Sequence, residues 1–228
     1  NLQQIQYPAL ALLISGGHTE LVLVRGMGDY EILGQTRDDA VGEAFDKVAR
    51  MLGLSYPGGP EISKLAETAL PTKIPPYPLP RPMLKTDNFD FSFAGLKTAV
   101  LYTLKNIINP TQEDKASIAK EFEDSVTEIL VSKTLKAAME YDVKEIILGG
   151  GVTANKKIRE AFREMVSREL PDTKLFIPTY DLSTDNALMI AIAGLIRFGE
   201  TEKTIVAEGH LRLAESNRPT LAELRKKK

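Results

Sequence analysis

The sequence predicts a domain of the α/β class, in which strands and helices alternate along the chain. Two observations predict this class. Short apolar runs end in glycine loops that open helices, most clearly at residues 145–155, where a buried strand leads through three glycines into a helix. The chain has 228 residues, of which 43% are hydrophobic and 26% charged, so it has a globular composition and enough length to bury a sizeable core.

The strands are predicted from short runs rich in Leu, Val and Ile that turn residues bound. Gly16 and Gly17 separate the first two runs, which predicts a hairpin-like pair. A Gly26-Met27-Gly28 turn precedes the third run. In chain order the expected strands span residues 8–15, 20–25, 29–36, 143–148 and 175–177.

The helices are predicted from apolar residues that recur at three- and four-residue spacing. Gly53 supplies a left-handed cap for the first of them, and the last is apolar at nearly every position. In chain order the expected helices span residues 39–52, 62–70, 95–108, 114–141, 155–168 and 187–198. Between the second and the third, six prolines at 71–82 exclude a regular helix or a central strand, so we expect an extended connector there.

The composition excludes several classes of protein. The absence of cysteine excludes thiolate catalysis, disulfides and cysteine-based metal sites, and the two histidines, His18 and His210, exclude an all-histidine metal site. No apolar run approaches the roughly 20 residues that span a bilayer, so no membrane association is expected. A net charge of -2 gives no overall signal for nucleic-acid binding.

Gly149, Gly150 and Gly151 form the strongest candidate ligand site. Glycines let the backbone approach a ligand closely, and the N–H groups of the loop and the following helix start favour an anion such as phosphate. We therefore expect a phosphate-binding loop, and expect a side chain at Gly150 to block the ligand while leaving the fold mostly intact. A tight turn that binds nothing is the alternative. No Lys-Ser/Thr pair follows the glycines, so this is not a Walker loop.

Three further candidates keep two interpretations each. The segment from Ser15 to Thr19 is either a ligand-facing glycine corner or an ordinary glycine hairpin. Asp46 is either a solvated helical carboxylate or projects into a cleft to hold hydroxyl or amide groups. Asp185 is either a helix N-cap or first-turn acid, or a metal ligand.

Six motifs in a fixed order resemble one known family. The motifs are Ser15-Gly16-Gly17-His18-Thr19, Gly42-Glu43-Ala44-Phe45-Asp46-Lys47, Tyr56-Pro57-Gly58-Gly59-Pro60, Phe91-Ser92-Phe93-Ala94-Gly95-Leu96-Lys97-Thr98, Gly149-Gly150-Gly151-Val152-Thr153-Ala154-Asn155 and Thr184-Asp185-Asn186. Their order is similar to that of the TsaD family, with the bacterial form as the nearer match. The resemblance implies an actin-like, sugar-kinase-like and Hsp70-like (ASKHA) α/β fold, incomplete at the N-terminus, with a ligand cleft.

The resemblance also implies an activity and its site. The family transfers the threonylcarbamoyl group of threonylcarbamoyl-AMP to the adenosine beside the anticodon (position 37) of tRNAs that read ANN codons. By position, the residues implied to line the ligand pocket are Leu13, Ile14, Ser15, Gly16, Gly17, Asp46, Gly59 and Asn155. Asp185 is implied as a ligand of one divalent metal ion, iron or zinc. No catalytic side chain is assigned.

The organisation implied by the resemblance has three parts. Residues 1–37 would be the remainder of an N-terminal lobe, residues 38–199 the C-terminal lobe with its connector at 71–82, and residues 200–228 a tail. The family carries a His-x-x-x-His pair before the strand that opens at Ala9, and the sequence given starts after it. We therefore expect a piece of a longer enzyme, lacking two metal ligands and of doubtful activity by itself.

The resemblance implies a cytoplasmic protein whose partners are tRNA, a paralogous actin-fold subunit and a small ATPase. A run of basic residues at 156–163 either meets tRNA phosphates or is a solvated helix face. Two other functions stay open, namely an actin-fold nucleotide-binding ATPase or kinase and a non-catalytic partner-binding subunit. A phosphate-directed acidic pair and a kinase signature are not evident in the sequence, which disfavours the first of these.

Overall fold

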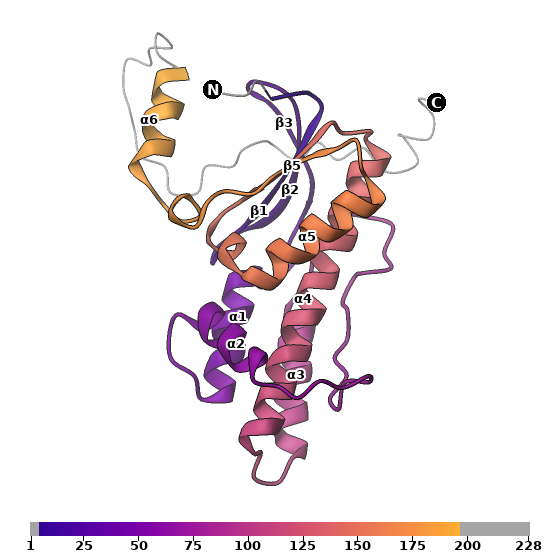
Figure 1. Ribbon diagram of the computed structural model, residues 1–228, viewed down its shortest axis with the longest axis vertical. Helices are drawn as coiled ribbons and strands as arrows, with labels where there is room; N and C mark the ends of the chain where they lie inside the picture. The colour runs from indigo at the N-terminus through magenta and orange to yellow at the C-terminus, as the bar shows by residue number, and fades with distance from the viewer. Residues whose placement is uncertain (1–4, 197–228) are drawn as a thin grey trace.

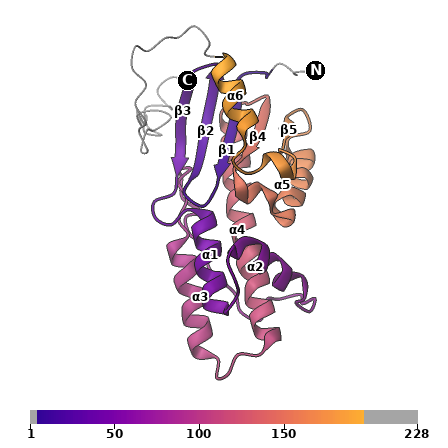
Figure 2. The ribbon, with the colours of Figure 1, turned by 90° about the vertical axis from the view of Figure 1, so that its left-hand side faces the viewer.

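The computed structural model describes residues 5–196, which contain one five-stranded mixed sheet in the order β3-β2-β1-β4-β5. β1 pairs antiparallel with β2 and parallel with β4, while β2 pairs antiparallel with β3 and β4 parallel with β5. Figure 2 shows these strands side by side at one end of the molecule. The strands are β1 (Ala9–Ile14), β2 (Thr19–Gly26), β3 (Asp29–Gln35), β4 (Glu145–Gly149) and β5 (Lys174–Phe176).

Most of the helices form the other end of the molecule or run from it toward the sheet, while the last described helix lies at the sheet end, as Figure 1 shows. The α-helices are α1 (Val41–Leu52), α2 (Gly58–Glu67), α3 (Ala94–Asn106), α4 (Gln112–Glu140), α5 (Lys156–Glu169) and α6 (Ala187–Ile196), and the 3-10 turns are η1 (Gly151–Ala154) and η2 (Tyr180–Leu182). α4 is the longest, with 29 residues, and contacts α2, α5 and β1. It therefore joins the helical end to the sheet.

Every expected strand and helix is present, with ends that move by a few residues. The largest shift is at α2, which begins at Gly58 rather than Ile62. The Asp46 carboxylate accepts a hydrogen bond from the Gly58 N–H (2.7 Å) and thereby extends the helix into what the glycines and prolines predict to be a turn. Pro60 is tolerated because a helix's first turn does not use that N–H. The expected tail at 200–228 lies outside the described residues.

The core lies between one face of the sheet and the helices. Leu10, Leu12 and Ile14 alternate along β1 and are fully buried, and they belong to one cluster with Phe45 of α1 and Phe122 of α4. Period-two burial on the strand and helical periodicity on α1 both face this core. β1 and β4 share a ladder, so the predicted division after residue 37 does not separate two sheets.

The proline-rich connector is held in place by hydrogen bonds to α4. It has no regular secondary structure, as expected, and is held by the buried Glu121, which accepts hydrogen bonds from the Leu79 N–H and from Arg81.

α6 is apolar on every side, yet none of its described residues is buried. No described helix combines the length and apolar content that crossing a bilayer requires.

Lys133 of α4 makes the stability of this fold depend on pH. Its side chain is buried, and its Nζ donates to the Thr86 hydroxyl (3.1 Å) and the Asn88 carbonyl (3.0 Å). Burial, reinforced by repulsion from Lys136 and opposed by Asp90, lowers the pKa of Lys133 from 10.5 to about 8. Between these two pH values the unfolded chain holds a proton that the folded chain has lost. The free energy of unfolding should therefore rise with pH across that window, by at most about 1.4 kcal/mol per pH unit.

Urea unfolding at half-unit steps from pH 7 to 10.5, compared between the wild type and Lys133→Met, measures this effect. Methionine does not titrate. The contributions of all other titrating groups to the pH dependence of stability therefore cancel when the two proteins are compared. The stability of the wild type relative to the variant should increase with pH above about pH 8. A pH-independent difference would show that Lys133 keeps its proton in the folded chain throughout.

Candidate functional site

A cavity of about 580 Å³ lies where the sheet meets the helical end. The turn after β1, the start of α2, η1 and the start of α5 converge on it, so segments far apart in sequence contribute to one site. Figure 1 shows the start of α5 near the start of α1, which is the region of the molecule that contains the cavity. The lining residues are Gly16, Gly42, Phe45, Asp46, Tyr56, Pro57, Gly59, Pro60, Ser63, Gly151, Val152, Ala154, Asn155, Lys156, Tyr180 and Thr184.

The glycine turn after β1 is fixed by Ser15. Its hydroxyl accepts hydrogen bonds from the N–H groups of Gly17 (3.2 Å) and His18 (3.0 Å), and its carbonyl accepts from the Gly42 N–H (3.1 Å). A Cβ at Gly42 would lie 2.7 Å from that carbonyl oxygen, so only glycine lets α1 start this close to the turn. Gly16 thereby reaches the cavity, whereas Gly17 and His18 are exposed.

The three glycines after β4 have different roles. Gly150 has φ +94°, and a Cβ there would lie 2.4 Å from the Ile14 carbonyl oxygen, so this glycine lets the loop cross the end of β1. A Cβ at Gly151 would meet nothing closer than the Thr184 methyl group at 3.9 Å, and Gly151 lines the cavity. The expectation that a side chain at Gly150 leaves the fold intact is therefore wrong. Of the three glycines, Gly151 is the one that lines the cavity.

Asp46 of α1 lines the cavity, and its carboxylate is hydrogen-bonded within the protein. One carboxylate oxygen, Oδ1, accepts the hydrogen bond from Gly58 at the first turn of α2, where backbone N–H groups are otherwise unsatisfied. A carboxylate at a helix N-terminus is also stabilised by the helix dipole. Asp46 therefore anchors α2 and presents a half-buried carboxylate at the cavity wall.

Ser63, Glu123 and Asn155 form a hydrogen-bonded group that we call the Glu123 cluster. Glu123 Oε1 accepts from the Ser63 hydroxyl (2.6 Å) and from Asn155 Nδ2 (2.8 Å), and Asn155 Nδ2 also donates to Ser63 Oγ (3.0 Å). Asn155 Oδ1 caps α5 by accepting from the Ile158 N–H (2.9 Å). Sequence analysis identified Asn155 and missed the other two. The sequence predicts a turn at Gly59 and a helix only from Ile62, so the helical spacing of Gly59 and Ser63 appears only in the structure.

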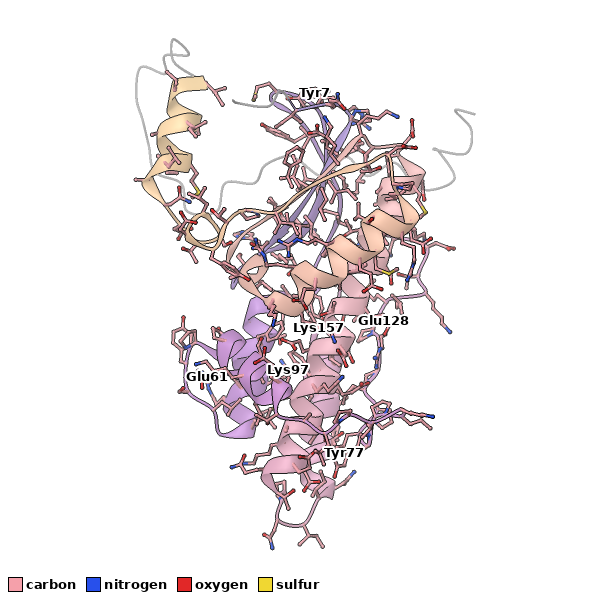
Figure 3. All side chains as sticks on the ribbon, viewed as in Figure 1. Tyr7, Glu61, Tyr77, Lys97, Glu128 and Lys157 are labelled. Atoms are coloured by element: carbon pink, nitrogen blue, oxygen red, sulfur yellow. The ribbon has the colours of Figure 1, made fainter. Side chains whose placement is uncertain are left out.

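The basic run at the start of α5 is divided among different environments. Lys156 lines the cavity, while Lys157 pairs with Asp124 of α4 (2.6 Å) at the crossing of the two helices, where Figure 3 labels it. Burial raises the pKa of Asp124, but hydrogen bonds from Lys120 and Lys157 outweigh this and lower it. Arg159 is buried, donates to the Thr153 and Pro178 carbonyls and lies 4.5 Å from the Tyr180 ring. These residues therefore do not form one continuous basic face.

A second charged group lies at the entry to α1. Asp39 pairs with Lys47 (2.8 Å) and with Lys97 (2.6 Å), which Figure 3 labels on α3. Burial raises the pKa of Asp39, but the hydrogen bonds and charges of both lysines outweigh it, so that the pKa lies below its usual value. Asp39 is therefore ionised at neutral pH and ties α3 to the start of α1.

The cavity brings together part of the implied ligand site. Gly16, Asp46, Gly59, Gly151 and Asn155 line it. The Ile14 side chain belongs to the hydrophobic core, so only its backbone is near the glycine loop. Gly151 belongs to the predicted phosphate loop, whose other two glycines, Gly149 and Gly150, do not line the cavity. The residues implied by the resemblance that do not line it are Leu13, Ile14, Ser15 and Gly17.

Asp185 does not form a metal centre with its described neighbours. Within residues 5–196 no group of three or more His, Asp and Glu side chains is placed to hold a metal ion, and structural or catalytic transition-metal sites need at least three protein ligands. Asp185 is not the N-cap of α6, because Asn186 Oδ1 accepts from the Met189 N–H (3.0 Å) and caps that helix. Asp185 is exposed beside this cap.

The strand order, the glycine loops at the ends of β1 and β4, and the cavity beside them define an actin-like α/β domain with a candidate ligand site. A crystal structure of HypF from T. kodakarensis has this fold, with a TM-score of 0.52 and 18% identity over 71% of this chain and 20% of that chain. The predicted fold class is confirmed. Residues 1–192 match the TsaD family, described as tRNA N6-adenosine threonylcarbamoyltransferase, and the chain belongs to that family.

Curated relatives carry the same description. The tRNA N6-adenosine threonylcarbamoyltransferase of Listeria monocytogenes serotype 4b (strain CLIP80459) is 49% identical over 196 residues, which are 86% of this chain and 56% of the relative. That of Geobacillus kaustophilus (strain HTA426) is 47% identical over 205 residues, 90% of this chain and 58% of the relative. The chain thus spans a little over half the length of the curated relatives it matches.

Proposed function

We propose that the chain carries the adenylate-binding part of a tRNA N6-adenosine threonylcarbamoyltransferase. The observation that supports this most directly is the cavity, because four residues that the resemblance implies for the ligand pocket line it together with Gly151 of the predicted phosphate loop. In the proposed reaction the N6 amine of the tRNA adenosine attacks the carbonyl carbon of threonylcarbamoyl-AMP. A carbon–nitrogen bond forms, the bond from that carbon to the phosphate oxygen breaks, AMP leaves and the amine loses a proton.

The chain's own residues would bind and orient the adenylate. The N–H groups at Gly151 and at the start of α5, with Lys156, suit a phosphate group, since a helix N-terminus and an ammonium group both favour an anion. Phe45, Pro57 and Val152 give the cavity apolar surface that suits a base. Asp46 suits the hydroxyl groups of a ribose. Exclusion of water from such a site protects the reactive anhydride from hydrolysis.

We further propose the remaining features that the family resemblance implies. Asp185 would supply one ligand to an iron or zinc ion whose other ligands lie outside residues 5–196, and no step of the reaction is assigned to that ion here. tRNA, a paralogous actin-fold subunit and a small ATPase would be the partners, in the cytoplasm. The HypF likeness shows the fold alone and leaves the activity open. A nucleotide-binding ATPase or kinase of the same fold is therefore the second candidate.

A chimera tests the proposal. This chain replaces the matching segment of the Geobacillus kaustophilus relative, which supplies the rest of the protein. The chimera is incubated with threonylcarbamoyl-AMP and unmodified tRNA, and mass spectrometry of the digested nucleosides is expected to show threonylcarbamoyladenosine. A chimera that hydrolyses or transfers the phosphate of ATP without modifying tRNA would instead favour the ATPase or kinase.

A further inference from the structure

Glu123 is a buried carboxylate that the proposed reaction does not use. It lies in the middle of α4, is 6% exposed and does not line the cavity. Both of its hydrogen-bond donors, Ser63 and Asn155, do line the cavity. A buried carboxylate costs free energy unless it is hydrogen-bonded, so its two donors explain how it is tolerated, and its position connects it to the site.

The orientation of the Asn155 amide follows from partners that have only one possible role. The Ile158 N–H can only donate, so the atom that faces it is the amide oxygen. An ionised Glu123 carboxylate can only accept, so the atom that faces it is the amide nitrogen. The two partners lie on opposite sides of the amide and agree, which fixes its orientation without ambiguity.

The Glu123 cluster uses all of its hydrogen-bond donors internally. Asn155 has two N–H bonds, of which one points to Glu123 and the other to Ser63. Ser63 has one O–H bond, and the short 2.6 Å contact assigns it to Glu123 rather than to the Gly59 carbonyl at 3.2 Å. Each of Asn155 Oδ1 and Ser63 Oγ keeps one lone pair. Together with the Asp46 carboxylate, this side of the cavity offers acceptors.

We propose that Glu123 is a positioning residue that gives the cavity wall its hydrogen-bond polarity, so that Ser63 and Asn155 accept hydrogen bonds from hydroxyl groups of the ligand. Without Glu123, the Ser63 hydroxyl and one Asn155 N–H lose their acceptor, and the Ser63 hydroxyl, which can rotate, turns toward the cavity as a donor. A ligand with vicinal hydroxyls, such as a ribonucleotide, is then recognised less well than before. This inference rests on the proposed function only in taking an adenine nucleotide as the ligand.

Calorimetry with AMP and 2′,3′-dideoxy-AMP measures the discrimination for ligand hydroxyls. The wild-type chain is expected to bind AMP at least tenfold more tightly than the dideoxy compound. In Glu123→Ala this ratio should fall at least threefold, even though Asp46 is unchanged. Glu123→Leu, which fills the same space without an acceptor, serves as a second variant that maintains packing, and its ratio should fall in the same way.

Glu123→Gln distinguishes positioning from charge. The glutamine oxygen can accept from Ser63 and Asn155 as the carboxylate does, so the ratio should return to within about twofold of the wild type. Glu121→Ala is the matched control, because Glu121 is as buried on the same helix but holds the connector through Leu79 and Arg81. This control is expected to lower the melting temperature and leave the ratio unchanged.

The outcomes separate the two proposals. The role of Glu123 would be overturned if the wild-type chain showed the expected preference for AMP and both Glu123→Ala and Glu123→Leu kept the full ratio. The proposed function would still stand in that case. An equal loss of the ratio in Glu121→Ala would also overturn it, because the effect would then be one of general stability. A wild-type chain that binds neither nucleotide would overturn the adenylate site itself.

Discussion

Replacing Gly150 with alanine should lower the free energy of unfolding by about 3 kcal/mol. The new Cβ would lie 2.4 Å from the Ile14 carbonyl oxygen and 2.9 Å from its carbon, both backbone atoms of the central strand that cannot turn aside. Moving β1 or the loop to relieve this overlap costs roughly 1–3 kcal/mol. The backbone at φ +94° adds roughly 1–2 kcal/mol for any residue with a Cβ.

Urea unfolding followed by circular dichroism measures the loss, with Gly151→Ala as the matched control. The neighbouring Cβ has no contact closer than 3.9 Å, so the control should unfold within about 0.5 kcal/mol of the wild type. Because Gly151 lines the cavity, the control should instead weaken AMP binding. Similar stability of the two variants would contradict the assignment of Gly150 to the fold and Gly151 to the site.

Asp46→Asn should weaken AMP binding by about 1.5–3 kcal/mol, or roughly 10- to 150-fold in Kd. Asparagine keeps an oxygen that can accept from the Gly58 N–H, so the start of α2 is preserved. The second carboxylate oxygen becomes an NH₂ group, which cannot accept from a ligand hydroxyl. The cavity loses one charged acceptor while its shape is unchanged.

Calorimetry with AMP and thermal unfolding of the free protein separate binding from stability. Asp46→Asn should melt within about 2 °C of the wild type, whereas Asp46→Ala should lose both AMP affinity and melting temperature because the α2 N-terminus loses its acceptor. Wild-type affinity in Asp46→Asn would show that the Asp46 carboxylate does not touch the nucleotide and serves α2 alone.

The pattern of apolar residues predicted the fold well because it records local geometry. Alternation along β1 and the three- and four-residue spacing along α1 depend only on which side of an element faces the core. The start of α2 was less predictable. Gly58, Gly59 and Pro60 favour a turn by themselves, and the helix reaches Gly58 because a carboxylate twelve residues earlier accepts its N–H.

Candidate site residues were predictable where a motif carried them and not where a distant contact did. Asp46, Gly59 and Asn155 stand in motifs and line the cavity. Glu123 stands in a long helix that is buried on most of its sides, and its sequence neighbours give no sign that its carboxylate meets Asn155 thirty-two residues later. Asp185 stands in a motif, yet the described residues contain no group of three or more side chains that could hold a metal ion.

The sequence by itself determined the α/β class, the order of the elements, the membership of the TsaD family and the glycine-rich character of the site. These properties depend on the local conformational preferences of the residues and on the order of the motifs, and both can be read from the sequence alone. Only the tertiary structure decided that Gly150 serves the fold and Gly151 lines the cavity, that Asn186 rather than Asp185 caps α6, and that Glu123 accepts hydrogen bonds from Ser63 and Asn155. Each of these depends on which backbone or side chain from a distant segment lies within a few ångströms, and pairing in a sheet and packing of helices set those distances.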